Sequence, residues 1–344
     1  IEIDPIYTTA GWSVEGAAED LYFGAAIAGA GDVNGDGYSD IIVGVSGYDN
    51  ERGCVYFYPG SALGLLGTST TTLSGANEGD FFGTSVSSAG DVNGDGYGDV
   101  IVGAIDYASI YVGGSEGLSE TAQTTMAEGN TDDFGLSVSN AGDVNGDGYG
   151  DVIVGAAQYT SHTGRAYVYA GSSAGISNVA ATILTGASTG IYFGESVSRA
   201  GDVNGDGYDD VIVGAYGYSS SKGRSYVYLG SSSGLSTLAS TTLTGASTGD
   251  EFGKTVAAAG DVNGDGYDDV LVSALGYSSS KGAVYLYRGS ASGISTTATT
   301  TLTGSSSNAY FGLSIAGAGD VNQDGYQDAI IGQYIYSNYY GGGV

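Results

Sequence analysis

The sequence predicts an all-β protein built from repeated four-stranded units, and three observations support this prediction. One nine-residue motif, Asp-Val-Asn-Gly-Asp-Gly-Tyr-x-Asp, occurs five times, and a sixth copy carries Gln323 in place of the first Gly. The copies are almost evenly spaced, beginning at Asp32, Asp91, Asp143, Asp202, Asp261 and Asp320. Each unit also contains four short stretches of alternating apolar and polar residues bounded by Gly, Ser and Asp, a pattern typical of strands.

The predicted strands follow one order within each unit. A Phe-Gly pair and an alternating stretch form the first strand, which leads into the acidic motif. An apolar run such as 211–214 forms the second strand, and four residues later every copy has Tyr before a polar turn. The alternating stretch 226–228 forms the third strand, and the Ser/Thr-rich segment 240–245 the fourth. Four antiparallel strands per tandem repeat are typical of a β-propeller blade; a β-helix, whose coils are usually shorter, is the alternative.

The repeats predict a single propeller domain over residues 1–344. The chain stops at 341–344, where other repeats enter the third strand, while 1–3 and 6–14 have strand-like patterns. We therefore expect six blades, the last one shared between the two termini, because sharing removes the free strand edges of an open array.

Composition excludes several classes of function. Hydrophobic residues make up 41% of the chain, enough for a packed core, whereas 38 acidic against 8 basic residues give a net charge of −30. A surface this negative disfavours nucleic-acid partners and anionic membranes, and no apolar run approaches the length of a membrane span. One Cys and one His exclude an intrachain disulfide framework and a zinc cluster built from several Cys or His ligands.

The acidic motif predicts a calcium loop. Oxygen-bearing side chains at positions 1, 3, 5 and 9 and a backbone carbonyl at position 7 can surround a hard cation, while Gly at position 6 allows a sharp turn. All-oxygen ligation with several carboxylates suits Ca²⁺ best and Mg²⁺ second. The predicted ligands are Asp32, Asn34, Asp36, Tyr38, Asp40, Asp91, Asn93, Asp95, Tyr97, Asp99, Asp143, Asn145, Asp147, Tyr149, Asp151, Asp202, Asn204, Asp206, Tyr208, Asp210, Asp261, Asn263, Asp265, Tyr267, Asp269, Asp320, Asn322, Asp324, Tyr326 and Asp328.

The alternative is that these segments are metal-free turns, since Asn-Gly and Asp-Gly form turns readily. Six copies that keep the ligand positions favour about six Ca²⁺ per chain. Three carboxylates in one loop would otherwise repel one another.

Gln323 stands where the other five copies have Gly. We therefore expect a backbone conformation at Gln323 that Gly adopts at lower cost.

Phe-Gly, the acidic motif and the following Val-Gly-Ala together resemble the FG-GAP repeat of integrin α-subunit propellers and their bacterial relatives. The resemblance covers essentially the whole chain, although the Pro of Gly-Ala-Pro is absent, as in 154–156 and 213–215. Integrin propellers have seven blades, so seven is the alternative to six. The resemblance implies Ca²⁺ in the loops between first and second strands and extracellular, often adhesive, ligand binding.

We predict an extracellular or cell-surface binding module without enzymatic activity, whose unidentified protein or glycan ligand binds the face of variable loops opposite the metal loops. One alternative is a subunit of a surface layer or filament, self-associating through the split terminal blade. A second is a polysaccharide lyase or hydrolase, for which no catalytic pair can be named.

The predicted third strands carry pairs of tyrosines, such as Tyr226 and Tyr228. They could form a sugar-stacking surface, but we expect them to pack between blades, because aromatic residues dominate the packing of strand faces.

Overall fold

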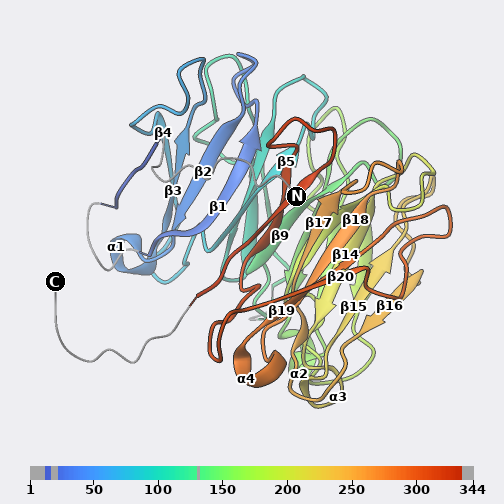
Figure 1. The fold of residues 1–344 in the computed structure, drawn as a ribbon. Helices are drawn as coiled ribbons and strands as arrows, with labels where there is room; N and C mark the ends of the chain where they lie inside the picture. Colours follow the sequence, from blue (N-terminus) through green and yellow to red (C-terminus); the bar gives the residue numbers. More distant parts are fainter. Residues whose placement is uncertain (1–11, 17–21, 130–131, 335–344) are drawn as a thin grey trace.

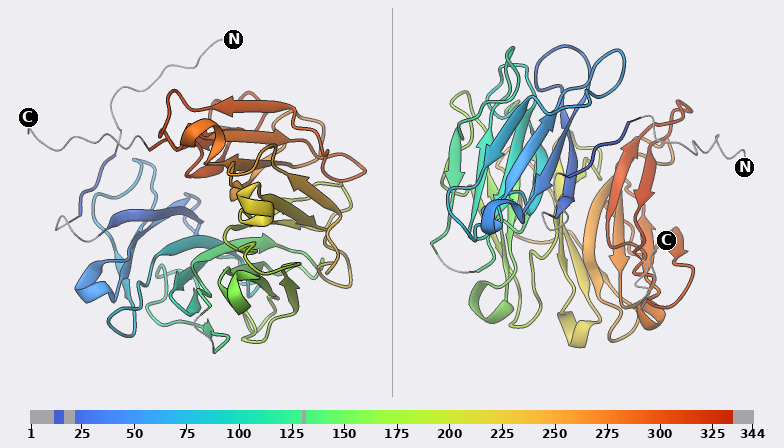
Figure 2. Two further views of the ribbon diagram at one scale, coloured as in Figure 1. Left: turned by 90° about the horizontal axis from the view of Figure 1, so that it is seen from below. Right: turned by 90° about the vertical axis from the view of Figure 1, so that its left-hand side faces the viewer.

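The computed structural model describes residues 12–16, 22–129 and 132–334, and these residues form six antiparallel sheets that follow one another around a common axis (Figures 1 and 2). Five sheets have four strands, each in simple sequential order, and the sixth has two. The described fold is therefore an all-β propeller, and the four-strand repeat predicted from the sequence is confirmed.

The strands of the first three sheets are β1 Phe23–Gly31, β2 Asp40–Val45, β3 Cys54–Tyr58, β4 Thr71–Ser74, β5 Ser85–Gly90, β6 Asp99–Ala104, β7 Tyr107–Tyr111, β8 Thr124–Met126, β9 Ser137–Gly142, β10 Asp151–Ala156, β11 Arg165–Tyr169 and β12 Thr182–Thr185. Those of the last three are β13 Val197–Gly201, β14 Asp210–Ala215, β15 Arg224–Tyr228, β16 Thr241–Thr244, β17 Phe252–Gly260, β18 Asp269–Ala274, β19 Ala283–Tyr287, β20 Thr300–Thr303, β21 Ile315–Gly319 and β22 Asp328–Ile331.

The hydrophobic core lies between successive sheets. Second strands that have a neighbouring sheet on both faces, such as β14, are buried along their whole length, which explains why they are continuous apolar runs. The outer strands alternate, with Leu243 of β16 buried and its neighbours Thr242 and Thr244 exposed. One core cluster joins Val168 and Leu184 of the third sheet to residues of the fourth sheet and its Phe-Gly segment, including Phe193. Each blade is thus stabilised mainly by its neighbours.

The tyrosine pairs belong to this core. Tyr167 and Tyr169 are almost completely buried, and the ring of Phe134 lies 5.4 and 6.4 Å from theirs. The contact recurs in the next repeat, where Phe193 meets Tyr226 and Tyr228. The same core clusters hold residues of the preceding sheet, such as Met126 beside the first pair and Leu184 beside the second, so packing between blades is confirmed for these pairs.

Four of the described loops between second and third strands contain short helical turns that the periodicity did not predict. They are α1 Tyr48–Glu51, α2 Tyr159–His162, α3 Tyr218–Ser221 and α4 Tyr277–Ser280, and they lie at one end of the sheets (Figure 1). Consecutive residues in each have positive φ, for example 51° and 59° at Ser219 and Ser220. These turns therefore adopt a left-handed conformation, which short polar residues tolerate better than bulky ones.

Most of the segments that were predicted to share the last blade, 1–3, 6–14 and 341–344, lie outside the described residues, and 12–14, which are described, do not form a strand. Ile27 of β1 is 69% exposed, whereas its counterpart Val86 of β5 is buried against the preceding sheet. At the other end of the array, Ile330 of β22 is 64% exposed. The six-blade count and the shared blade remain predictions.

Among the helices of the described residues, none has the length and apolar character needed to cross a bilayer.

Candidate functional site

The six acidic motifs lie in the loops between first and second strands, at the end of the sheets opposite the helical turns (Figure 1). The first motif, for example, begins directly after β1 at Asp32 and ends where β2 begins at Asp40. In a blade of sequential antiparallel strands, the first and third connections share one end and the second connection lies at the other.

Each loop is wound around the carboxylate at position 1. In the fourth loop, Asp202 accepts hydrogen bonds from the backbone N–H groups of Gly205, Asp206 and Gly207 at 2.7, 3.1 and 2.8 Å. The side chain of Asp206 in turn accepts the N–H of Tyr208 at 3.1 Å. The bonds from the position-5 and position-6 amides to the position-1 carboxylate recur in all six loops.

The aspartate at position 9 has a different environment, which the sequence reasoning missed. Asp210 is fully buried, and its two carboxylate oxygens accept the N–H of Val203 at 2.9 Å and of Gly230 at 2.9 Å. Gly230 lies beyond the end of β15, so this carboxylate ties the loop to the third strand. Asp40, Asp99, Asp151 and Asp269 make the same pair of bonds.

Burial has an electrostatic consequence at position 9. Desolvation raises the pKa of Asp99 and Asp269 to about 6 and that of Asp151 and Asp210 to about 7, although the two backbone hydrogen bonds oppose the shift. The exposed position-5 carboxylates lie outside this buried environment. Within one motif, the structure therefore separates a buried anchor from exposed acidic groups.

The donor chemistry of the loops fits a hard cation, but the structure does not assemble three carboxylates in advance. Across 12–16, 22–129 and 132–334, no group of three or more Asp, Glu, His or Cys side chains is arranged to hold a metal ion. Positions 1 and 5 are engaged with amides of their own turn, and position 9 with those of its neighbours. Cation binding would therefore require some of these carboxylate oxygens to turn toward the ion.

Neighbouring loops are joined to one another, a second feature absent from the sequence reasoning. The N–H of position 8 donates to the position-1 carbonyl of the preceding loop, as from Asp209 to Asp143 at 3.1 Å and from Asp268 to Asp202 at 3.1 Å. In the second to sixth loops, the ring of the position-7 Tyr lies on position 4 of the preceding loop, so that a Cβ on Gly205 would be 2.7 Å from Tyr267. The loops thus form one continuous array.

This contact explains Gly at position 4, whose φ is +73° at Gly205. Gln323, at the same position of the sixth loop, has φ +60°, which confirms that Gly would adopt this backbone at lower cost.

Gly205→Ala is expected to destabilise the protein by about 2–4 kcal/mol, because it combines an unfavourable positive φ with overlap against Tyr267. Gly207→Ala is the matched control: its φ is +88°, but nothing lies within 4 Å of the added carbon, so about 1–2 kcal/mol is expected. Urea unfolding at a constant calcium concentration measures the loss of unfolding free energy in both variants. Equal losses would show that the contact between loops contributes nothing.

The opposite face carries the variable loops. The guanidinium groups of Arg165 and Arg224 lie 3.6 Å from the ring centroids of Tyr159 and Tyr218, at the helical turns. Nearby in the structure, Tyr192 stacks on Tyr216 at 4.9 Å. Basic and aromatic groups are therefore presented together on a protein that is otherwise strongly acidic.

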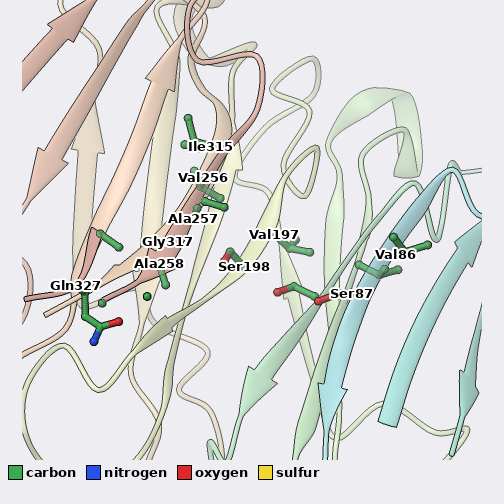
Figure 3. Close-up of a pocket in the computed structure, with 16 residues that line it drawn as sticks. Val86, Ser87, Val197, Ser198, Val256, Ala257, Ala258, Ile315, Gly317 and Gln327 are labelled. Atoms are coloured by element: carbon green, nitrogen blue, oxygen red, sulfur yellow. The ribbon is translucent and has the colours of Figure 1, made fainter. Parts of the chain in front are cut away.

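A pocket lies among the first strands of successive sheets. It has a volume of about 460 Å³ and is lined by first-strand residues such as Ser87, Ser139, Ser198 and Val256 (Figure 3). The lining residues are uncharged and mostly small. Gln327 of the sixth acidic motif is among its lining residues, but none of the acidic side chains and none of the basic or aromatic groups lines it.

The fold and its repeated acidic loops define a β-propeller of tandem four-stranded blades. The FG-GAP repeat model matches residues 23–58, 82–111 and 134–169, and the FG-GAP-like repeat model matches 202–272 and 261–331. The chain therefore belongs to the FG-GAP repeat family, as its motifs indicated.

Integrin α subunits are among its relatives. The chain is 34% identical to integrin alpha-4 of Xenopus laevis over 192 residues, which cover 53% of this chain and 18% of the relative. It is 33% identical to integrin alpha-V of Gallus gallus over 223 residues, or 58% and 21% of the two chains. It is 38% identical to integrin alpha-IIb of Mus musculus over 167 residues, which cover 44% of this chain and 16% of the relative. The chain thus corresponds to about a fifth of these relatives or less.

Proposed function

We propose that this chain is an extracellular, calcium-binding propeller module of the adhesion type. Its ligand binds on the face formed by the helical turns and the connections between blades. The observation that supports the calcium part best is the sixfold recurrence of one loop conformation around the position-1 carboxylate. Similarity to integrin α subunits supports the ligand-binding part.

Calcium fits the loops because their donors are carboxylate, amide and carbonyl oxygens. Positions 1, 3, 5 and 9 and the position-7 carbonyl would hold the ion, as in the fourth loop with Asp202, Asn204, Asp206, Tyr208 and Asp210. The ion would neutralise carboxylates that otherwise repel one another. Its role is structural, because each loop joins two strands of a blade.

The turn face suits a ligand because its loops differ between repeats while the sheets beneath them are rigid. The second repeat, for instance, joins β6 to β7 by a tight turn at Asp106, whereas the fourth inserts α3 between β14 and β15. Arg165 and Arg224, which lie over tyrosine rings, would favour acidic groups on the ligand.

An array of extracellular-matrix proteins and glycans, probed with the calcium-loaded protein, tests the proposal. We expect at least one ligand whose binding falls about tenfold or more in Arg165→Ala/Arg224→Ala. Arg288→Ala is the control, because Arg288 follows β19 at the acidic-loop end and should leave binding unchanged. Equal loss in both variants would place the ligand elsewhere, and release of reducing sugar from a bound glycan would support an enzyme instead.

A further inference from the structure

The third strand of the second blade differs from the others at one inward-facing position. In the other four-stranded sheets, a tyrosine stands opposite the central valine of the second strand: Tyr56 opposite Val43, Tyr167 opposite Val154, Tyr226 opposite Val213 and Tyr285 opposite Val272. In the second sheet, Ser109 stands opposite Val102. The register is the same, so this blade lacks one phenol ring.

That ring normally fills space beside the Phe of the Phe-Gly pair. The ring centroids of Phe134 and Tyr167 are 5.4 Å apart, and those of Phe252 and Tyr285 are 5.6 Å apart. In the second blade, Tyr107 lies instead beside Phe82, with centroids 6.3 Å apart. Because Tyr107 begins β7, two residues before Ser109, it does not replace the missing ring at the same position.

A pocket is found where the ring is missing. It has a volume of about 360 Å³ between the first and second sheets, and Phe82, Tyr107, Ser109 and Tyr111 are among its lining residues. Phe82, Ser109 and Tyr111 are buried and form its floor, whereas Asn77 and other rim residues are exposed. An apolar cavity of about 150 Å³ already holds benzene, so this pocket has room for a substituted ring.

The polar groups of the pocket select the kind of ring. The hydroxyls of Ser109 and Thr125 are 2.9 Å apart, and the phenol of Tyr107 donates to Asp80 at 3.0 Å. The lining residues are uncharged, so a charged ligand would lose hydration without gaining a partner. Aromatic walls with hydroxyl groups suit a neutral ring that carries one hydroxyl.

We propose that the pocket between the first two blades binds a phenol-type aromatic ring, the group that the second blade itself lacks. The ring would pack against Phe82 and Tyr111 and exchange hydrogen bonds with the hydroxyl pair. A tyrosine side chain presented by another chain and a free phenolic molecule share this chemistry. The proposal is independent of the calcium sites, whereas Ala76 and Asn77 belong to a connection between blades and hence to the proposed ligand face.

Titration with p-cresol at constant calcium, followed by NMR, tests the proposal. The expected dissociation constant is on the order of 1 mM for so small a ligand. Ser109→Tyr, which restores the residue of the other repeats, is expected to weaken binding at least tenfold. Ser109→Ala keeps the space and should retain binding within about threefold. Ser109→Leu is a second filling variant in case the tyrosine prevents folding.

A parallel titration with N-acetyltyrosinamide distinguishes a tyrosine side chain from a free phenolic molecule as the natural ligand. Binding of both compounds supports a tyrosine side chain as the natural group, and binding of p-cresol alone supports a free phenolic molecule. The proposal is overturned if neither compound binds, or if both filling variants fold and bind p-cresol as well as the unmodified protein does.

Discussion

Excess chelator is expected to lower the melting temperature of this protein by tens of degrees or to unfold it, and added Ca²⁺ is expected to reverse the effect. Binding to the folded state contributes about 2.7 kcal/mol per site when the free ion is at a hundredfold excess over its dissociation constant. Six independent sites would together contribute about 16 kcal/mol as an upper limit, which rivals the whole stability of an ordinary domain.

Scanning calorimetry with and without chelator measures this effect, and isothermal titration of the chelated protein counts the sites. We expect between five and seven sites, with dissociation constants of roughly 10⁻⁴ to 10⁻³ M as in extracellular modules. A titration with NaCl is the control, because the net charge of −30 makes screening alone stabilising. A chelated protein that melts within a few degrees of the loaded one, or a count of two or fewer, would indicate metal-free turns.

Asp210→Ala is expected to cost much more stability than Asp206→Ala, although both residues belong to the same loop. Asp210 is buried, and its removal leaves the N–H groups of Val203 and Gly230 without acceptors, at about 1–3 kcal/mol each. Asp206 is exposed and accepts one backbone N–H from Tyr208, so its structural cost is about 1 kcal/mol.

Urea unfolding at one fixed calcium concentration separates structural from metal-binding roles, since both variants remove one proposed ligand from the same site. The expected difference is about 2–4 kcal/mol, and failure of Asp210→Ala alone to fold would agree with it. Equal costs for the two variants would mean that the carboxylate at position 9 acts only as a ligand.

Much of the site could be predicted because its residues are close together in the chain. Asp202 and Gly207 are five residues apart, so their type and spacing specify the turn around the carboxylate. The anchoring role of Asp210 could not be predicted in this way. Its bond to Gly230 spans 20 residues and depends on where β15 ends. The recurrence of Gly at 171, 230 and 289, each 20 residues after a position-9 Asp, was a signal that could have revealed this anchor.

The repeating unit, its four strands and the acidic loops could be predicted, because strand alternation and turn formation depend on neighbouring residues. The contacts between repeats become visible only in the folded chain: the ring of Tyr267 lies on Gly205, the N–H of Asp268 donates to the carbonyl of Asp202, and a pocket lies beside Ser109. The two contacts join residues more than 60 positions apart, and the residues that line the pocket are separated by up to about 50 positions. The pocket also depends on a tyrosine ring that the second blade lacks. The period of a repeat specifies its own strands, whereas the fit between two blades depends on side chains from both.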